Sequence, residues 1–398
     1  MSPFGKFLFC LTLLAAWRLS STLFAEAPPA PGVDSASRNA SCLALAREAG
    51  VRAEGGTARN FVISPLSIHA ALAKVAAGAR GDTLNELLRF LGSASLNELH
   101  RAAATKLVGR LNGIAQTSFA SGVWVDRMLA LKPEFTAIAA SRYNATAESV
   151  DFVSGAEQAR QRVNAFVADA TNKHILEVLP PGSFKGAWTQ PFDVSTAPFH
   201  IPGGITVRVP SMTTSESQHI AVYPGFTALK LPYKNDVQQQ AEFYMLILLP
   251  DSETEIADLY DKAVSTPEFI KTHTPTVKVP VGRLMVPKFK FTSKFELSSD
   301  MRKLGVTRAF EGGDFSGMMT GGEGLSINAV YHKATIEVDE VGTVAAAATA
   351  IVGFGSAGPG APRDLVDFVA DRPFLFAVVE EGTDAVLFLG HVANPLTH

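Results

Sequence analysis

The amino-acid sequence predicts one mixed α+β domain in which helices come first and antiparallel-rich sheets follow. Hydrophobic residues make up 47% of the 398 residues and charged residues 18%, so the chain can bury a large core. Apolar residues recur at helical spacing up to about residue 174, whereas strand-like runs dominate after Gly182. The order contains no β-α-β alternation and no internal repeat, which argues against a parallel, doubly wound sheet.

The first part of the chain carries several helix-start signals. Ser64 and Pro65 predict the N-cap and first turn of a helix that follows a short strand near residue 60. Thr83 and Glu86 have the spacing of a capping box, which predicts the start of another helix. Apolar periodicity predicts further helices over residues 39–52, 95–111, 134–142 and 156–174.

The second part of the chain contains short runs of β-branched and apolar residues that are typical of sheet strands. Residues 122–125 and 148–152 have the same character earlier in the chain. The runs in the second part cover residues 206–209, 227–233, 243–249, 284–291 and 385–389.

The N-terminus has the pattern of a secretory signal peptide. Lys6 precedes an apolar run too short to span a bilayer, and the small residues Ala25 and Ala27 predict a cleavage site, so residues 1–27 are expected to be removed. Residues 28–38 are rich in Pro and Ser and are expected to be flexible. We therefore expect a secreted protein, with a cytoplasmic protein that carries an N-terminal extension as the alternative.

Cysteines and glycosylation motifs are compatible with either location. Cys10 would leave with the signal peptide, and Cys42 would then have no partner in the chain, so no disulfide framework is expected. The sequons at Asn39 and Asn144 predict a glycoprotein only if the chain is secreted.

Charge and motif content argue against several function classes. The net charge is −3 and no long run of Lys or Arg occurs, which argues against nucleic acid as a partner. The nine His residues lack metal-ligand spacing, so neither a metal nor another cofactor is expected. A G-x-G-x-x-G match at residues 353–358 fails because Pro359 and Pro362 prevent the helix that a dinucleotide site requires. Without a catalytic signature, we expect neither an enzyme nor a membrane protein.

A series of short motifs runs in order along most of the chain. They are Asn60–Ser67 (NFVISPLS), Phe184–Phe192 (FKGAWTQPF), Val209–Met212 (VPSM), Val286–Phe289 (VPKF), Phe368–Phe376 (FVADRPFLF) and Leu387–Pro395 (LFLGHVANP). As a set they resemble the serpin family of serine protease inhibitors, and most closely its plant branch, over residues 39–395. The resemblance implies the serpin fold, with three β-sheets, about eight or nine helices and an exposed reactive-centre loop.

The resemblance assigns the loop to residues 340–366, inside a stretch that opens acidic, continues through small residues and ends in a Gly/Pro-rich tip. The same resemblance places the reactive bond, the bait for a protease, between Ser356 and Ala357. It also implies the hinge of the loop, namely Glu340, Gly342, Thr343, Val344, Ala345, Ala346, Ala347 and Ala348.

In such proteins the cleaved loop inserts into the main sheet as a new strand and distorts the attached protease. Thr343, Ala345, Ala347 and Thr349 would face the core on alternate positions, and their small side chains permit insertion. A charged side chain at one of these core-facing positions would have to be desolvated, which would stall insertion of the loop. We therefore expect a monomeric inhibitor whose partner is a serine or cysteine protease. Plant relatives often carry Arg at the reactive bond, whereas Ser356 favours enzymes that prefer small or apolar residues.

The resemblance also implies a structural shutter of the main sheet, formed by Asn60, Ser64, Ser67 and His332. The strand-like context of His332 independently predicts a hydrogen-bonded core histidine rather than a catalytic one.

The chain departs from the family between Ser183 and Phe184, where relatives have a turn and most of a strand. That strand lies in the main sheet beside the opening that the loop enters. Either the gene model is incomplete, or the chain cannot build the metastable sheet and does not inhibit. The second case leaves open a non-inhibitory protein of the same fold that acts in storage, transport or interaction.

Overall fold

The computed structural model describes residues 6–9, 35–52, 59–102, 117–118, 122–143, 145–151, 154–170, 181–184, 186–189, 192–234, 242–251, 256–343 and 365–397. These residues form two compact units that interleave along the chain. The first unit contains Met1–Ala49, Ile63–Ser183 and Lys294–Ala334, and the second contains Gly50–Val62, Phe184–Ser293 and Thr335–His398.

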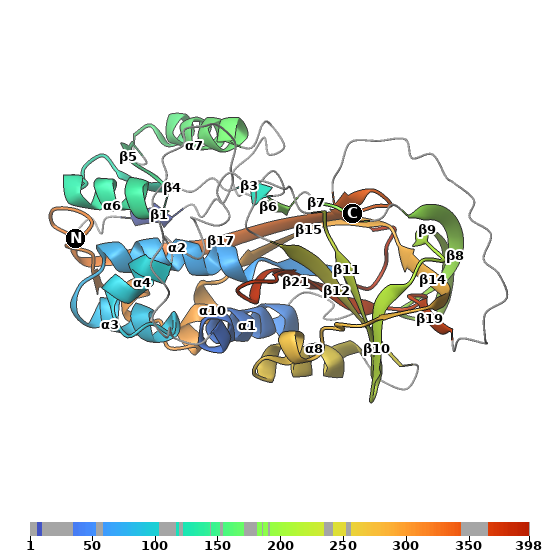
Figure 1. The fold of residues 1–398 in the computed structure, drawn as a ribbon. Coiled ribbons are helices and arrows are strands. Elements are labelled where there is room, and N and C mark those ends of the chain that lie inside the picture. The colour runs from blue at the N-terminus through green and yellow to red at the C-terminus, as the bar shows by residue number, and fades with distance from the viewer. Residues whose placement is uncertain are drawn as a thin grey trace, which may run out of the picture. The chain divides into compact units, whose positions relative to one another are not determined.

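Helix α2 (Pro65–Gly78), in which every residue is buried, packs against α3, α4 and α6 (Figure 1). A helix buried on all sides lies inside a core rather than on its surface. The helices that lie wholly or mostly in this unit are α1 (Ser35–Arg52), α2 (Pro65–Gly78), α3 (Gly81–Phe90), α4 (Leu96–Ala102), α6 (Pro133–Tyr143), α7 (Ala156–Ala170), α10 (Ser298–Lys303) and the 3-10 helix η3 (Arg308–Phe310).

The predicted start of α2 is confirmed. Ser64 is the N-cap, and its side-chain oxygen accepts a hydrogen bond from the Ser67 N–H at 3.4 Å. Pro65 follows in the first turn, where its missing N–H is no loss. Helix α1 begins at Ser35, so the last residues of the segment 28–38 are helical rather than flexible.

The predicted capping box at the start of α3 is wrong. Helix α3 begins at Gly81, and its N-cap is Arg80, which makes no side-chain cap. Thr83 Oγ1 instead accepts a hydrogen bond from the Asp314 N–H at 2.9 Å. Glu86 accepts from the N–H groups of Thr307 and Arg308, both at 2.9 Å. The two side chains of the motif therefore satisfy main-chain donors of distant segments rather than those of their own helix.

Strand β17 (Glu323–Val338) is the longest strand of the described chain and organises the six-stranded sheet. It pairs with β1, β6, β15 and β16, and β6 pairs in turn with β3. A separate parallel pair joins β4 to β5. The other strands named here are β1 (Lys6–Phe9), β3 (Thr117–Ser118), β4 (Gly122–Asp126), β5 (Thr146–Val150), β6 (Pro181–Phe184), β15 (Phe289–Glu296) and β16 (Gly313–Asp314).

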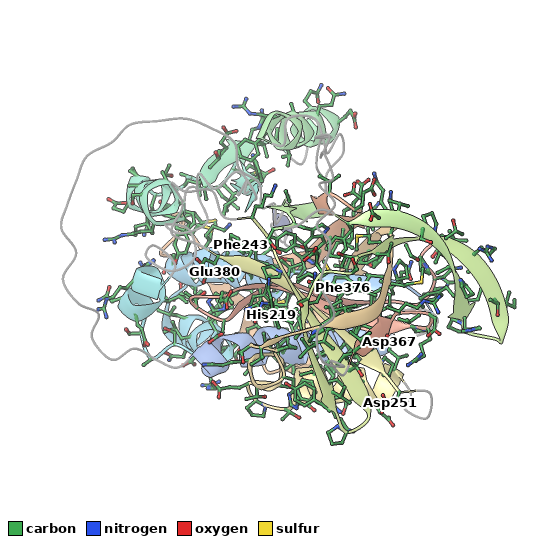
Figure 2. All side chains as sticks on the ribbon, turned by 45° about the vertical axis from the view of Figure 1, so that its right-hand side comes forward. His219, Phe243, Asp251, Asp367, Phe376 and Glu380 are labelled. Atoms are coloured by element: carbon green, nitrogen blue, oxygen red, sulfur yellow. The ribbon has the colours of Figure 1, made fainter. Side chains whose placement is uncertain are left out.

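The second unit contains a seven-stranded sheet in the order β13-β10-β11-β12-β20-β21-β2. Its central strands β12 and β20 are buried throughout and pair antiparallel, which brings Phe243 opposite Glu380 (Figure 2). The strands of this sheet are β2 (Phe61–Ile63), β10 (Gln218–Tyr223), β11 (Phe226–Pro232), β12 (Phe243–Pro250), β13 (Lys278–Val279), β20 (Phe374–Glu380) and β21 (Ala385–Val392).

A four-stranded sheet in the order β19-β14-β9-β8 and the short pair β18-β7 complete the sheets of the second unit. Helices α8 (Ile256–Ser265) and α9 (Phe269–Thr272) also belong to it. These strands are β7 (Gly186–Ala187), β8 (Asp193–Ile201), β9 (Ile205–Thr213), β14 (Val281–Pro287), β18 (Gly342–Thr343) and β19 (Val366–Val369). The predicted α+β class with three principal sheets is confirmed.

Two of the predicted strands differ in detail. The run 284–291 is two strands, because β14 pairs with β9 whereas β15 pairs with β17, and the chain changes sheets at Lys288. The strand expected over 148–152 covers Thr146–Val150 instead, where it pairs with β4.

Candidate functional site

The site has at its centre the loop that the sequence assigns to residues 340–366. The structure describes its two flanks, up to Thr343 and from Leu365 onward. The predicted hinge residues Val344, Ala345, Ala346, Ala347 and Ala348 and the predicted reactive bond Ser356–Ala357 lie outside the described residues. The site is therefore built from the flanks and from the β17 region.

Trp188 holds the chain at the start of the loop. Its indole Nε1–H donates to the Asp339 carbonyl oxygen at 2.9 Å, and its main-chain N–H donates to the Val341 carbonyl oxygen at 2.9 Å. The ring is 2% exposed and stacks on Tyr233 with 4.5 Å between centroids. A buried indole needs a partner for its N–H, and here that partner is the main chain of the loop's flank.

The hinge residues Gly342 and Thr343 pair antiparallel with Ala187 and Gly186 as the short ladder β18-β7. Just before them, the Val341 N–H donates to Asp339 Oδ1 at 2.9 Å, which closes a local turn. The first flank is thus fixed through main-chain groups, so its conformation depends little on which small side chains occupy the hinge.

Glu340 forms an ion pair with Lys288, the residue at which the chain passes from β14 to β15. Lys288 Nζ lies 2.5 Å from Glu340 Oε2. The hydrogen bond from the Lys288 ammonium group lowers the pKa of the Glu340 carboxyl group below its ordinary value. The predicted hinge acid is therefore ionised at neutral pH and paired.

The second flank of the loop enters β19, which runs parallel to β14. Asp367 Oδ1 accepts a hydrogen bond from the Arg283 N–H at 2.8 Å (Figure 2 labels Asp367). A Cβ atom at Gly282 would lie 2.5 Å from that same oxygen, so a larger residue there would displace the Asp367 carboxylate. The Ala370 N–H donates to the Met285 carbonyl oxygen at 2.8 Å. Both flanks are therefore anchored within the second unit.

Three of the four predicted shutter residues meet in the first unit. The Ser64 N–H donates to His332 Nε2 at 3.0 Å, and Ser67 Oγ–H donates to the Ser64 carbonyl oxygen at 3.1 Å. His332 is buried, and desolvation lowers its pKa to about 3. The imidazole is therefore neutral and accepts the Ser64 N–H, as expected of a core histidine.

Asn60 does not join this group through its described contacts. Its Oδ1 accepts the N–H groups of Ala393 at 2.8 Å and Asn394 at 2.9 Å. Its Nδ2 donates to the Asn394 carbonyl oxygen at 2.8 Å and to Thr397 Oγ1 at 2.9 Å. An amide side chain that both donates and accepts fits such a main-chain turn, so Asn60 holds the C-terminal turn of the second unit.

The point between Ser183 and Phe184, where the chain departs from the family, falls within a short strand. Strand β6 covers Pro181–Phe184 and pairs with β17 only at Lys333 and Ala334 among the described residues. The remainder of that edge of β17 has no partner from β6.

The two predicted glycosylation sites are at Asn39 and Asn144. Asn39 lies in α1 and only its main chain is described, whereas Asn144 lies outside the described residues. Among the described residues, no group of three or more His, Cys, Asp or Glu side chains is arranged to hold a metal ion. No described helix is long and apolar enough to cross a membrane.

Sequence reasoning missed the roles of Trp188 and Lys288. Both residues belong to motifs that the sequence displays, FKGAW and VPK. A lone Trp after a Gly-Ala pair was a usable signal, because a buried indole needs an acceptor, but its acceptor lies 151 residues away in sequence. No local pattern identifies such a partner.

Comparison with known proteins agrees with these motifs. The family model described as serpin (serine protease inhibitor) matches residues 37–395. Serpin-Z12 of Oryza sativa subsp. japonica is 60% identical over 401 residues, covering 93% of this chain and 93% of the relative. Serpin-ZX of Arabidopsis thaliana is 38% identical over 363 residues, covering 85% of this chain and 92% of the relative. The solved structure of Arabidopsis AtSerpin1 in its native stressed conformation matches with a TM-score of 0.80 and 33% identity, covering 92% of this chain and 100% of that one.

The alignment with the rice relative also bears on the short strand. It extends over 401 residues although it covers only 93% of the 398 residues present here. The relative therefore contains residues without a counterpart in this chain. A deletion between Ser183 and Phe184 is compatible with that surplus.

Proposed function

The chain belongs to the serpin family, and on that premise we propose that it inhibits a serine protease by offering its reactive-centre loop as a substrate. Members of this family are in general protease inhibitors rather than enzymes. The observation that carries the proposal is the anchoring of both loop flanks, by Trp188 on one side and by β14 on the other. A bait loop must be held at both ends so that a protease can bind the stretch between them.

The target is a protease that prefers small or apolar residues, because the reactive bond is Ser356–Ala357. Cleavage there leaves an acyl-enzyme on the Ser356 side. Insertion of the hinge from Thr343 onward then carries the enzyme along the sheet before the ester is hydrolysed. Papain-type cysteine proteases form a comparable acyl-enzyme and are the second target class.

The proposal is tested by incubating the full chain with elastase-, chymotrypsin- and papain-like proteases. We expect a complex that survives denaturant and gel electrophoresis, with a released peptide that begins at Ala357 by mass spectrometry. If every protease cleaves the loop and stays fully active, inhibition is refuted.

A matched pair of hinge variants separates insertion from binding. Thr343→Arg places a charge where the inserting strand must enter the core, and burying an unpaired charge is strongly unfavourable. We expect Thr343→Arg to be cleaved at an unchanged rate but to trap no protease, whereas Thr343→Ser should trap as well as the parent. Equal trapping by both variants would contradict loop insertion.

One observation favours the alternative function of a non-inhibitory protein with the same fold, namely the short reach of β6 along β17. The discriminating measurement is the melting temperature before and after loop cleavage. The melting temperature of an inhibitor rises markedly after cleavage, because loop insertion releases the protein from a kinetic trap. A storage, carrier or interaction protein without a usable opening should show no gain.

A further inference from the structure

The edge of β17 is covered by two separate strands in the first unit. Toward its C-terminal end, Lys333 and Ala334 pair in parallel with Pro181 and Gly182 of β6. Nearer its start, Ser326, Ile327 and Val330 pair in parallel with Lys6, Phe7 and Phe9 of β1. The N-terminal segment therefore takes up the ladder positions that β6 does not reach.

The neighbours of these strands indicate that β1 and β6 lie along the same edge of β17. Strand β6 pairs with β3 on its other side, and β1 contacts β4 (Figure 1). Strands β3 and β4 follow each other closely in the chain, at Thr117–Ser118 and Gly122–Asp126. Both short strands are thus enclosed between β17 and the β3–β4 segment.

An empty edge at this position would be unfavourable. Ile327 is 2% exposed, so β17 runs through the core here. The Val330 N–H donates to Ser298 Oγ and its C=O accepts the Leu297 N–H, so the groups that need a partner on the β1 edge are those of the alternate residues. Buried N–H and C=O groups without partners are strongly unfavourable. A parallel strand satisfies those groups through its main chain, whatever its side chains are.

We propose that Lys6–Phe9 is a strand of the uncleaved folded protein, which fills the part of β17's edge left open by the short β6. The segment is then retained as part of the sheet rather than removed as the beginning of a signal peptide. This inference goes beyond the proposed function and does not depend on it, because it concerns the occupant of the sheet edge in the uncleaved protein.

The first test is hydrogen exchange on the full chain and on a variant that lacks residues 1–9. We expect the amides within Ser326–Ala329 that point toward β1 to exchange at least about tenfold faster in the truncated variant, because their ladder partner is gone, whereas the Val330 amide keeps its bond to Ser298 Oγ. Lys333 and Ala334 provide an internal control, since β6 still pairs with them. Unchanged protection at the amides of Ser326–Ala329 that point toward β1 would overturn the proposal.

The second test needs no truncation and so is insensitive to misfolding of a shortened chain. In a background of Cys10→Ser and Cys42→Ser, Phe7→Cys is combined with Ile327→Cys, its partner in register. Neighbouring residues on paired strands lie within disulfide reach, so mild oxidation should cross-link most of the protein. The control combines Phe7→Cys with Val194→Cys, which is exposed on β8. Equal cross-linking in both pairs, or none in either, would overturn the pairing.

The third test is the N-terminal sequence of the protein recovered from a eukaryotic host that can cleave signal peptides. Mass spectrometry should find Lys6–Phe9 retained in the folded protein. Recovery of folded protein only with Pro28 as its first residue would refute the proposal and support the signal peptide.

Discussion

The flanks of the reactive-centre loop and the edge of β17 are built in different ways. Each flank is held by several independent contacts within the second unit, including Trp188 on one side and Asp367 on the other. The edge of β17 in the first unit depends on two short strands, β1 and β6, with four residues each. The anchoring of the loop's flanks and the pairing along the edge of β17 are therefore separate features of this fold.

The largest effect is expected from breaking the first flank at Trp188. Trp188→Ala removes a buried ring that stacks on Tyr233 and leaves the Asp339 carbonyl oxygen without its donor. Truncating a buried Trp costs about 3–5 kcal/mol, so the free energy of unfolding measured in urea should fall by that amount.

Trp188→Phe is the matched control, because it keeps an aromatic ring but loses the N–H. We expect Trp188→Phe to lower the free energy of unfolding by less than half as much as Trp188→Ala. The amides of Asp339–Thr343 should exchange faster than in the parent. If Trp188→Ala left the exchange of Asp339–Thr343 unchanged, Trp188 would not be the anchor of this flank.

The next effect concerns Lys74, which lies in the buried helix α2 of the first unit. Burial lowers its pKa from 10.5 to about 7. Between these two values the unfolded chain binds more protons than the folded chain, so stability rises as the pH rises from about 7 toward 10.5. Below pH 7 the buried Lys74 carries its positive charge in the folded state, and the full free-energy cost of burying that charge lowers the stability.

Lys74→Met should therefore stabilise the protein by a few kcal/mol at pH 7, since each pKa unit corresponds to about 1.4 kcal/mol. The pH dependence of the melting temperature between pH 7 and 9.5 should flatten in the same variant. Lys132→Met provides a control at a lysine that is only partly buried. A loss of stability in Lys74→Met would show that the ammonium group has a favourable partner in the folded state.

His332 allows a similar test in β17 itself, with a smaller effect at neutral pH. Its pKa is lowered from 6.5 to about 3 by burial, so the folded protein binds fewer protons than the unfolded chain between these values. Stability attributable to this group is complete above pH 6.5 and is lost as the pH falls toward 3.

His332→Gln keeps an acceptor for the Ser64 N–H but cannot titrate. We expect it to cost about 1–2 kcal/mol at pH 7 and to lose less stability than the parent between pH 6.5 and 4, as followed by urea unfolding. Parallel pH profiles for the parent and the variant would exclude His332 as a source of acid sensitivity.

The same contrast explains which parts of the molecule were predictable from sequence. The start of α2 was predictable because Ser64 and Pro65 act locally, within one turn of their own helix. The capping box at Thr83 and Glu86 was not, because those side chains bind main-chain groups of residues 307–314, which no local pattern identifies. The loop's flanks could be located by motif, whereas the contacts of Trp188 and Lys288 depend on tertiary structure. The pairing of Lys6–Phe9 with β17 was not anticipated, since an apolar N-terminal run fits a signal peptide equally well.

The smallest expected effect is at the Lys288–Glu340 ion pair beside the loop. Both side chains remain about a third exposed, at 31% and 33%, and pairs so accessible to water contribute about 0–1 kcal/mol. Because the pKa of Glu340 is lowered, its contribution is present above pH 4.5 and is lost as the pH falls below that value. A double-mutant cycle with Lys288→Met and Glu340→Gln, measured by urea unfolding at pH 7 in low and high salt, should give a coupling energy below about 1 kcal/mol that shrinks with salt. A coupling well above that value would mean that the flank relies on this charge pair, and the first flank would then be less dependent on main-chain contacts than Trp188 and β18 indicate.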